Sequence, residues 1–430
     1  MNHASGIDNI PLTATDCFIL ALEKHDHHTG TSGNTCRYVV ELEGRLNKDD
    51  FESVLKSNLL AQQLYSFSIC KGNLFTVPKW KSISTSSIKV MCYEDDAYLP
   101  DAILNKKISA EKSNLFSFDI IYRSNGNSTL VFSWNHLLMD GYGAVLFLKQ
   151  LNGFGKEAGY LATDSAIRLN FSTLKEAVKA RFFLSSSAAN PTSGINPKKI
   201  YTEVNQRIKV LRFTKQETEQ IDLIAPTLGA RFGRSPFYLA CSARVIKAIL
   251  EKRATPVSNF WIPVPQNQRK KGTNGPLLGN HLSFLFYRLA ATMLDSLENT
   301  VKSINDQMVN QVRKGIPKAC DGLMNYLKRI PSSWYYQLIK GPQGGSLSGF
   351  LFTLAEDHPE ELLKFQGLNV VDALSFPPNT FPPGLTFAFM RFREQLQIMV
   401  LYYEEVITET EMESLEIQIR YELINGKHFN

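Results

Sequence analysis

Two segments of the chain share one order of hydrophobic and polar positions. In TCRYVVELEGRLNKDDFESVLKS, residues 35–57, apolar side chains first alternate as in a strand and then recur at helical spacing behind Asn47. We therefore predict a strand, an N-cap at Asn47 and a helix. Residues 207–224 repeat this order, with RIKVLRF as the strand and Thr214 and Glu217 as a capping box. Because the two openings lie about 170 residues apart, we predict two halves of duplicated architecture.

The rest of the pattern predicts strands and helices that interleave. In the first half we expect strands near 115–123 and 128–135 and a helix near 141–152. In the second half we expect helices near 215–227, 235–252, 294–314 and 409–424, and strands near 257–264, 281–290, 347–354, 384–393 and 395–403. The last two strands are expected to form a hairpin that turns at residues 393–395. Because strands and helices follow no strict alternation, we predict an α+β fold, a mixed α/β sandwich.

A segment rich in Ser, Asn, Pro and Gly separates the halves. SSSAANPTSGINPKK, residues 185–199, is the best candidate for a linker. We therefore predict an N-terminal half of residues 1–184, a linker of residues 185–205 and a C-terminal half of residues 206–430. Ahead of the linker, residues 174–184 are basic and amphipathic. We interpret them as a surface helix that packs Leu174, Val178 and Phe182 on the domain, with peripheral membrane contact as the alternative.

Composition and charge exclude several classes of protein. The 430 residues include 47 basic and 41 acidic ones, and the net charge of +6 is scattered along the chain, which argues against nucleic-acid binding. No apolar run approaches the roughly 20 residues that span a bilayer, and the N-terminus lacks the pattern of a signal peptide. We therefore expect a soluble, cytoplasmic and monomeric protein.

Cysteine and histidine usage indicates neither a disulfide framework nor a metal site. The 6 cysteines are far apart and form no CxxC pair. HDHH, residues 25–28, looks like a metal-binding tract, but no Cys or carboxylate follows it at ligand spacing. We interpret this tract as a surface loop and predict no metal.

The segment WNHLLMDGYG, residues 134–143, carries the strongest chemical signal. His136 ends a predicted strand in an apolar run, and Asp140 and Gly141 precede the next predicted helix. Taken singly, Asp140 could be a helix cap and His136 a core residue bonded to a backbone carbonyl. A neutral imidazole is also the side chain best suited to remove a proton from a weak nucleophile near pH 7. No GxSxG nucleophile motif competes with it.

These residues resemble a known family of acyltransferases. SWNHLLMDGYGAVLFL is similar to the HHxxxDG segment of the chloramphenicol acetyltransferase-like, or condensation-domain, superfamily. Three further segments resemble that superfamily in order and spacing, and the wax ester synthase/diacylglycerol acyltransferase branch looks nearest. They are PLTATDCFILALEK near the start, PVPQNQRKKGTNGPLLGNHLSFLFYRL in the second half and PPGLTFAFMRFREQLQIMVLYYEEVITETEMESL near the end. The resemblance implies two similar halves with the active site in a tunnel between them.

The resemblance also implies roles for individual residues. His136 would be the general base, without a covalent intermediate, and Asp140 would form a structural salt bridge with Arg269. Gly141 would allow a thioester to approach or a tight turn to form, and its N–H could help to stabilise an oxyanion. Asn135 stands where the motif has its first histidine. With Asn280 and Thr353 it is a candidate for the substrate channel, although Asn280 could be a turn residue and Thr353 a strand-face hydroxyl.

The implied activity is transfer of an acyl group from a coenzyme A thioester to an alcohol, which forms an ester. The thioester is a substrate, and no bound cofactor is expected. One alternative is a condensation-type reaction, in which an acyl carrier protein in trans delivers the acyl group and the acceptor is an amine or an alcohol. A second alternative is a non-catalytic member of the superfamily, for which Asn135 is the supporting observation.

Overall fold

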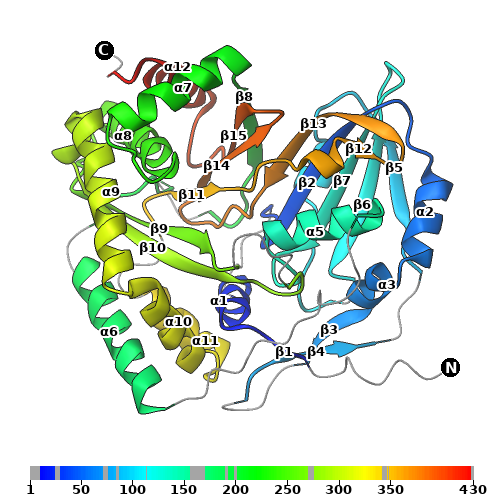
Figure 1. Cartoon of the computed structure of the whole chain (residues 1–430), viewed down its shortest axis with the longest axis horizontal. Coiled ribbons are helices and arrows are strands. Elements are labelled where there is room, and N and C mark those ends of the chain that lie inside the picture. The colour runs from blue at the N-terminus through cyan, green and yellow to red at the C-terminus, as the bar shows by residue number, and fades with distance from the viewer. Residues whose placement is uncertain are drawn as a thin grey trace.

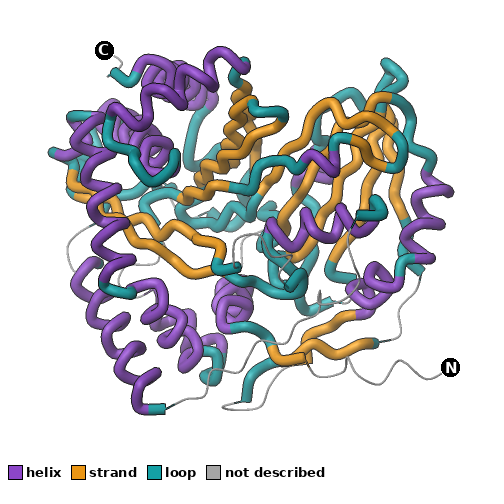
Figure 2. Tube along the Cα trace, in the orientation of Figure 1, coloured by secondary structure: helices purple, strands orange, loops and turns teal. Residues whose placement is uncertain are grey.

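The computed structural model describes residues 10–24, 30–70, 76–83, 87–112, 114–154, 170–188, 192–197, 201–269, 276–340, 346 and 348–427. Within these ranges helices surround several separate sheets (Figures 1 and 2). The HDHH tract and parts of the predicted linker lie outside the described residues.

A six-stranded sheet forms the centre of the first half. Its order is β12, β13, β2, β7, β6, β5. The strands span Lys364–Phe365, Leu368–Phe376, Thr35–Glu43, Ser128–Asn135, Phe116–Tyr122 and Val90–Glu94. Two of them, β12 and β13, come from the second half of the sequence, and β13 pairs antiparallel with β2. The strands of one sheet therefore cross the predicted boundary between the halves.

A four-stranded sheet forms the centre of the second half, in the order β11, β14, β15, β8. The strands span Leu351–Leu354, Leu385–Phe392, Gln395–Tyr403 and Gln206–Arg212. The predicted hairpin of β14 and β15 is confirmed. Its turn residues Arg393 and Glu394 have φ values of 46° and 66°, as a two-residue hairpin turn requires.

Two smaller sheets complete the strands. β9 (Asn259–Asn267) and β10 (Leu282–Ala290) form an antiparallel ribbon. β1 (Ile10–Pro11), β4 (Lys79–Ser82) and β3 (Phe67–Cys70) form a three-stranded sheet. In Figure 1 the β9–β10 ribbon passes between the helices at lower left and the six-stranded sheet at right.

The helices lie on the outer faces of the sheets. Those of the first half are α1 (Ala14–Glu23), α2 (Lys48–Ser57), α3 (Leu59–Ser66), α4 (Asp101–Leu104) and α5 (Gly141–Leu151). The others are α6 (Phe171–Ser187), α7 (Lys215–Thr227), α8 (Ser235–Lys252), α9 (Leu297–Arg313), α10 (Ile316–Leu327), α11 (Ser332–Lys340) and α12 (Glu409–Asn425).

Side-chain caps start the helices that open the two halves. The Asn47 side chain accepts hydrogen bonds from the backbone N–H groups of Asp49 and Asp50 at the start of α2. Thr214 and Glu217 form the predicted capping box of α7. Both predictions are confirmed. Such caps can be predicted because they depend only on neighbouring residues.

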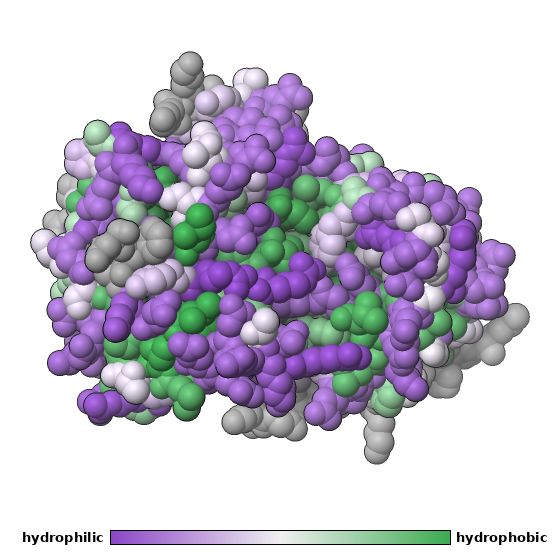
Figure 3. Space-filling model, turned by 90° about the horizontal axis from the view of Figure 1, so that it is seen from above, coloured by the Kyte–Doolittle hydropathy of each residue, from purple (hydrophilic) through white to green (hydrophobic). Residues whose placement is uncertain are grey.

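The largest hydrophobic clusters of the described residues lie beside and between the two main sheets. One lies between the six-stranded sheet and helices α2, α3 and α5, and a second between the four-stranded sheet and helices α7, α8 and α12. A third cluster joins the two sheets, with Val39 and Val131 of the first sheet against Met390 and Leu401 of the second. Seen from above, the surface is mostly hydrophilic, and hydrophobic residues show in the middle of this face (Figure 3).

One prediction about the surface of the first half is wrong. The helix before the linker exists as α6, but Leu174, Val178 and Phe182 do not pack on the domain and are 45%, 46% and 73% exposed. The helix instead buries Ala177 and Ala180, and it packs on α10 of the second half. The pattern indicated one apolar face correctly, but sequence alone did not tell which face the protein covers.

Candidate active site

A short turn holds His136 between a strand and a helix. β7 ends at Asn135, and α5 begins at Gly141. The indole N–H of Trp134 donates to the carbonyl of Met139 at 2.8 Å, which closes the turn. Met139 also forms a bridge with Gly279, whose N–H donates to the carbonyl of Leu138 at 2.8 Å. The turn is therefore clamped to a segment of the second half.

The environment of His136 favours a neutral imidazole. Its side chain borders a cavity, and its Nδ1 is buried without a hydrogen-bond partner. Burial lowers the pKa of His136, and its own carbonyl, Asp140 and Asn280 only partly offset this effect. Because the pKa lies below its ordinary value, the ring is unprotonated at neutral pH and can accept a proton.

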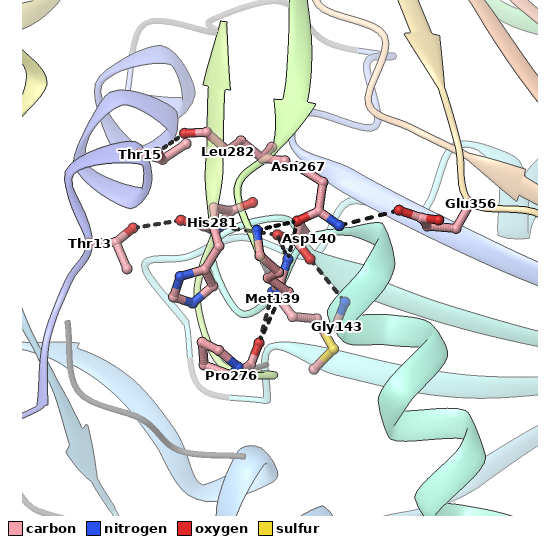
Figure 4. A network of polar contacts seen from close by, with 12 residues as sticks. Thr13, Thr15, Met139, Asp140, Gly143, Asn267, Pro276, His281, Leu282 and Glu356 are labelled. Atoms are coloured by element: carbon pink, nitrogen blue, oxygen red, sulfur yellow. Dashed lines mark hydrogen bonds and ion pairs between the residues drawn. The ribbon is translucent and has the colours of Figure 1, made fainter. Parts of the chain in front are cut away.

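Asp140 connects the turn to the second half through several hydrogen bonds (Figure 4). Its Oδ1 accepts from the N–H of Gly143 at 2.9 Å, which caps α5. Its Oδ2 accepts from Nη1 of Arg269 at 2.7 Å and from the N–H of His281 at 3.1 Å. The ion pair that the resemblance implies is therefore present, and both side chains are only 3% exposed.

Arg269 also forms hydrogen bonds within its own loop, and these determine which of its nitrogen atoms can reach Asp140. Nε and Nη2 of Arg269 donate to the carbonyl of Pro276 at 3.0 and 2.8 Å, so one guanidinium nitrogen remains for the carboxylate. The guanidinium also lies over the ring of Tyr142, 4.9 Å from its centroid. Arg269 thus ties its own loop to the start of α5, and none of the hydrogen bonds of Asp140 involves the imidazole of His136.

The two glycines at the start of α5 differ in the space around them. A Cβ on Gly141, which borders the cavity, would have nothing within 4 Å. A Cβ on Gly143 would lie 2.5 Å from the carbonyl oxygen of Leu277 and 2.9 Å from the Cβ of Met139. Close packing that excludes a side chain is therefore found at Gly143 and not at Gly141. Gly141 leaves open space in the cavity that His136 also borders.

Asn280 supports the backbone of His136 from the second half. Its Nδ2 donates to the carbonyl of His136 at 2.7 Å and to Oδ1 of Asp16 at 2.8 Å, and its N–H donates to the same oxygen at 2.8 Å. The carboxylate of Asp16 is fully buried, and it also accepts from the N–H of Thr13 at 2.8 Å. Asn280 does not border the cavity, so its contacts position His136 and do not line the channel.

Asn135 has a similar positioning contact in the first half. Its Nδ2 donates to Oε2 of Glu23 at 2.9 Å and to the carbonyl of Ile108 at 2.7 Å. Its Oδ1 accepts from the N–H of Leu137 at 2.9 Å, across His136. Asn135 is fully buried and does not border the cavity. The residue in the place of the first motif histidine therefore ties the turn that carries His136 to α1.

The cavity beside His136 has a volume of about 420 Å³, within the range of small-molecule sites. Residues on both sides of the predicted boundary line it. Part of its wall is apolar and comes from α1, α10, α11 and the β9–β10 ribbon, with Phe18, Phe284, Leu323, Leu327 and Leu338 among the side chains. Thr353 of β11 also borders the cavity, and so do the polar residues Asn267 and Glu356.

Two polar residues of the cavity wall come from separate segments and contact each other. Nδ2 of Asn267, at the end of β9, donates to Oε1 of Glu356 at 3.2 Å (Figure 4). Tyr142 and Arg269 border the cavity nearby. Of the candidate channel residues, only Thr353 therefore borders the cavity, whereas Asn135 and Asn280 lie behind His136.

Sequence reasoning missed Asp16, Gly143 and Glu23. Asp16 carried a signal, since it is an acidic residue within the apolar run of TDCFILAL and lies three residues after Thr13, as in a capping box. Gly143 and Glu23 carried none, because the atoms that they contact come from distant segments. Within the described residues, no cluster of His, Cys, Asp and Glu fits a metal ion, and no helix has the length and hydrophobicity to span a membrane.

Comparison with solved structures identifies the fold. No protein-family model matches the sequence, and no curated protein matches it. The first condensation domain of the calcium-dependent antibiotic synthetase matches with a TM-score of 0.70 and 13% identity, over 97% of this chain and 95% of that domain. Trichothecene 15-O-acetyltransferase from Fusarium sporotrichioides matches with a TM-score of 0.70 and 13% identity, over 98% and 96% of the two chains.

A third structure is a complex with ligands. It is the starter condensation domain of rhizomide synthetase, in a mutant form bound to C8-CoA and Leu-SNAC. It matches with a TM-score of 0.66 and 13% identity, over 97% of this chain and 94% of that chain. The chain thus has the mixed α/β fold, with two similar halves, of condensation domains and of this acetyltransferase.

Proposed function

We propose that the protein is an acyltransferase that moves an acyl group from a coenzyme A thioester to an alcohol. The observation that carries the proposal is the position of His136, whose imidazole borders a largely apolar cavity and has a lowered pKa. The order of the four sequence segments supports the proposal, and it is also our reason to place the protein near the wax ester synthase branch.

In the proposed mechanism, His136 removes the proton of the acceptor hydroxyl as its oxygen attacks the thioester carbonyl. A C–O bond forms, and the carbonyl oxygen takes up negative charge. The N–H of Gly141, the first residue of α5, is our candidate donor for this oxyanion. When the intermediate collapses, the C–S bond breaks and the thiolate leaves with the proton that the imidazolium held. No covalent enzyme intermediate forms.

In this proposal, Asn280, Asn135 and Asp140 act by positioning His136. Asn280 donates a hydrogen bond to the carbonyl of His136, and Asn135 accepts one from the N–H of Leu137. The backbone on the C-terminal side of the imidazole is therefore held in place. Asp140 accepts no proton in this mechanism. It joins α5 to the loop of Arg269, and so keeps the two walls of the cavity together.

The surroundings of the cavity support an apolar acyl group. Phenylalanine and leucine side chains of α1, β10, α10 and α11 line the cavity, so an alkyl chain would bury its surface against them. A coenzyme A donor is supported by the C8-CoA complex of a structurally similar domain, and an alcohol acceptor by the similar fold of an O-acetyltransferase.

The test is release of coenzyme A from octanoyl-CoA in the presence of a panel of straight-chain primary alcohols. The thiol would be followed colorimetrically and the ester by mass spectrometry. We expect wild-type turnover and no turnover above the uncatalysed rate in His136→Ala. Equal rates for the two proteins would reject His136 as the base. Asn58→Ala, far from the cavity on the N-cap of α3, is the control for the effect of a substitution as such.

The second candidate is a condensation-type reaction with a carrier-protein thioester and an amine acceptor. Its support is the similarity to two condensation domains. Incubation with an octanoyl-loaded acyl carrier protein, with amines in place of alcohols, separates the two candidates. Product from octanoyl-CoA and alcohols alone supports the first, and product only from the loaded carrier supports the second.

A further inference from the structure

Helix α6 carries large apolar side chains on its outer side. Phe171, Leu174, Val178 and Phe182 are 83%, 45%, 46% and 73% exposed. Their spacing of three or four residues places them on one face of the helix. Single exposed apolar residues are common on protein surfaces, but a contiguous apolar stripe marks a site of interaction.

The side of α6 that faces the protein buries the small residues Ala177 and Ala180, and it holds Phe183 and Leu184 half-buried beside them. Ala180 packs in a cluster with Ile316 and Ala319 of α10, and Ala177 is also buried. Figure 1 shows α6 at the lower left edge of the molecule, with α10 beside it. An ordinary surface helix turns its large apolar side chains inward, whereas α6 also exposes four of them on its outer side. Packing within the protein therefore does not explain the stripe.

Basic side chains flank the stripe. Lys175, Lys179 and Arg181 are exposed. Glu176 is the single acidic residue of α6, and it is half-buried and lies 3.7 Å from Nζ of Lys179. The side chain of Lys179 reaches the junction of α9 and α10 at Gly315, where Arg313 and Lys314 are exposed. The surface around the stripe is therefore positive, which suits an anionic partner.

The same helix forms part of the cavity wall. Arg181 and Leu184 border the cavity that reaches His136, and Arg181 is exposed. Arg181 lies three residues after Val178 and seven after Leu174, so it is beside the apolar stripe on the helix surface. The cavity thus reaches the protein surface next to the stripe.

We propose that α6 binds the surface of an anionic lipid bilayer. The contact is made by the outer α6 patch, which consists of Phe171, Leu174, Lys175, Val178, Lys179 and Phe182. An apolar stripe with basic flanks is the pattern of a helix that lies in the plane of the membrane interface. Binding there places the cavity edge at Arg181 against the lipid, so that an apolar substrate can enter without crossing water. Only this last step rests on the proposed function.

The test is flotation of the full-length protein with lipid vesicles. We expect it to float with vesicles of phosphatidylcholine mixed with phosphatidylserine, and much less with phosphatidylcholine alone. Phe171→Ser combined with Phe182→Ser removes the two most exposed apolar side chains of the patch and should abolish flotation. Lys175→Gln combined with Lys179→Gln should weaken binding roughly thirtyfold, since each basic residue near an anionic surface contributes about 1 kcal/mol.

Matched substitutions keep the test specific. Leu223 of α7 and Phe232 do not belong to α6, and they are 75% and 67% exposed. The variant that combines Leu223→Ser with Phe232→Ser therefore loses a similar apolar surface, and this variant should still float. Circular dichroism melting checks that each variant is folded. Coenzyme A release with soluble substrates should be equal in all of them, so a loss of flotation is distinct from a failure of the proposed function.

Three results would overturn the proposal. The first is that wild type floats with neither kind of vesicle. The second is that the Phe171/Phe182 variant floats like wild type. The third is that the wild type forms a dimer in sedimentation experiments that this variant cannot form, without flotation of either protein, which would show that a second copy covers the patch.

Discussion

At the scale of single residues, the surroundings of His136 determine its pKa and the position of its backbone. The sequence left open whether this histidine is a core residue or a base. Its Nδ1 lacks a hydrogen-bond partner, and its carbonyl is held by Asn280, so the backbone is anchored while the ring borders the cavity. The polar neighbours of the ring, Asp140 and Asn280, sit on separate segments of the chain. Asp140 and Asn280 raise the pKa of His136, but burial of the ring lowers it by more.

The pH dependence of the reaction follows from this shift. Because the pKa of His136 is below its ordinary value of about 6.5, the base stays neutral as the pH falls through that value. We expect kcat/KM to remain constant down to pH values below about 6.5, and then to fall as the ring takes up a proton. A profile of kcat/KM against pH measures this directly. An acidic limb centred at or above the ordinary value would contradict the lowered pKa.

The two glycines of the DGYG segment predict opposite phenotypes. Gly141→Ala adds a methyl group in open space at the cavity, so we expect unchanged stability and a kcat/KM that is lower by about tenfold or more. Gly143→Ala forces a Cβ against the Leu277 carbonyl and should destabilise the fold by about 1–3 kcal/mol. Urea unfolding and coenzyme A release separate the two effects. Equal losses of stability in both variants would refute the distinction.

At the scale of elements, α5 and the loop after β9 depend on each other. Asp140 caps α5 and pairs with Arg269, and the loop that carries Arg269 would otherwise lack this anchor. The pair is nearly inaccessible to water, so loss of one partner leaves a charge buried without compensation. The resemblance implied the pair, but the resemblance did not show that one carboxylate serves both as a cap and as an ion-pair partner.

The stability of the protein should reflect this burial. We expect Asp140→Ala to lower the free energy of unfolding by about 3–5 kcal/mol. The matched control is Arg45→Ala, which removes a pair with Glu94 at 2.8 Å whose side chains are 61% and 69% exposed. It should cost less than about 1 kcal/mol. Urea denaturation of both variants is the measurement, and similar losses would show that Asp140 gains nothing from its buried position.

At the scale of the whole molecule, the two halves exchange elements. β13 belongs to the second half of the sequence but pairs with β2, and α6 belongs to the first half but packs on α10. A shared hydrophobic cluster lies between the two sheets. The predicted linker at residues 185–205 divides the sequence into two halves. That these halves are separate domains stays a prediction.

This exchange predicts that neither half is stable alone. Residues 1–205 would expose the edge of β2 that β13 covers, and residues 206–430 would lose the partner of β13. We expect each fragment to lack cooperative unfolding, the full chain to unfold in one transition, and co-expressed fragments to associate. Urea unfolding followed by circular dichroism and by tryptophan fluorescence tests this. A cooperative transition of either fragment alone would contradict it.

Much of the local structure could be predicted because it depends on neighbouring residues. The caps at Asn47 and Thr214 and the hairpin of β14 and β15 follow from contacts over a few positions, and the structure confirms them. The helices α10 and α11 and the strand β13 were missed. The placement of β13 beside β2 joins residues more than 300 positions apart, and no local pattern encodes such a pairing.

The sequence by itself therefore determined the main helices and strands, the mixed α/β class and the candidate histidine, because periodicity and side-chain chemistry are local properties. Only the tertiary structure decided what surrounds that histidine. In the folded protein, Asn280 and Asp16 lie behind His136. Close packing excludes a side chain at Gly143 and not at Gly141, and an apolar face of α6 is exposed. These outcomes depend on which distant surfaces pack together, and that choice is made by the burial of the whole chain.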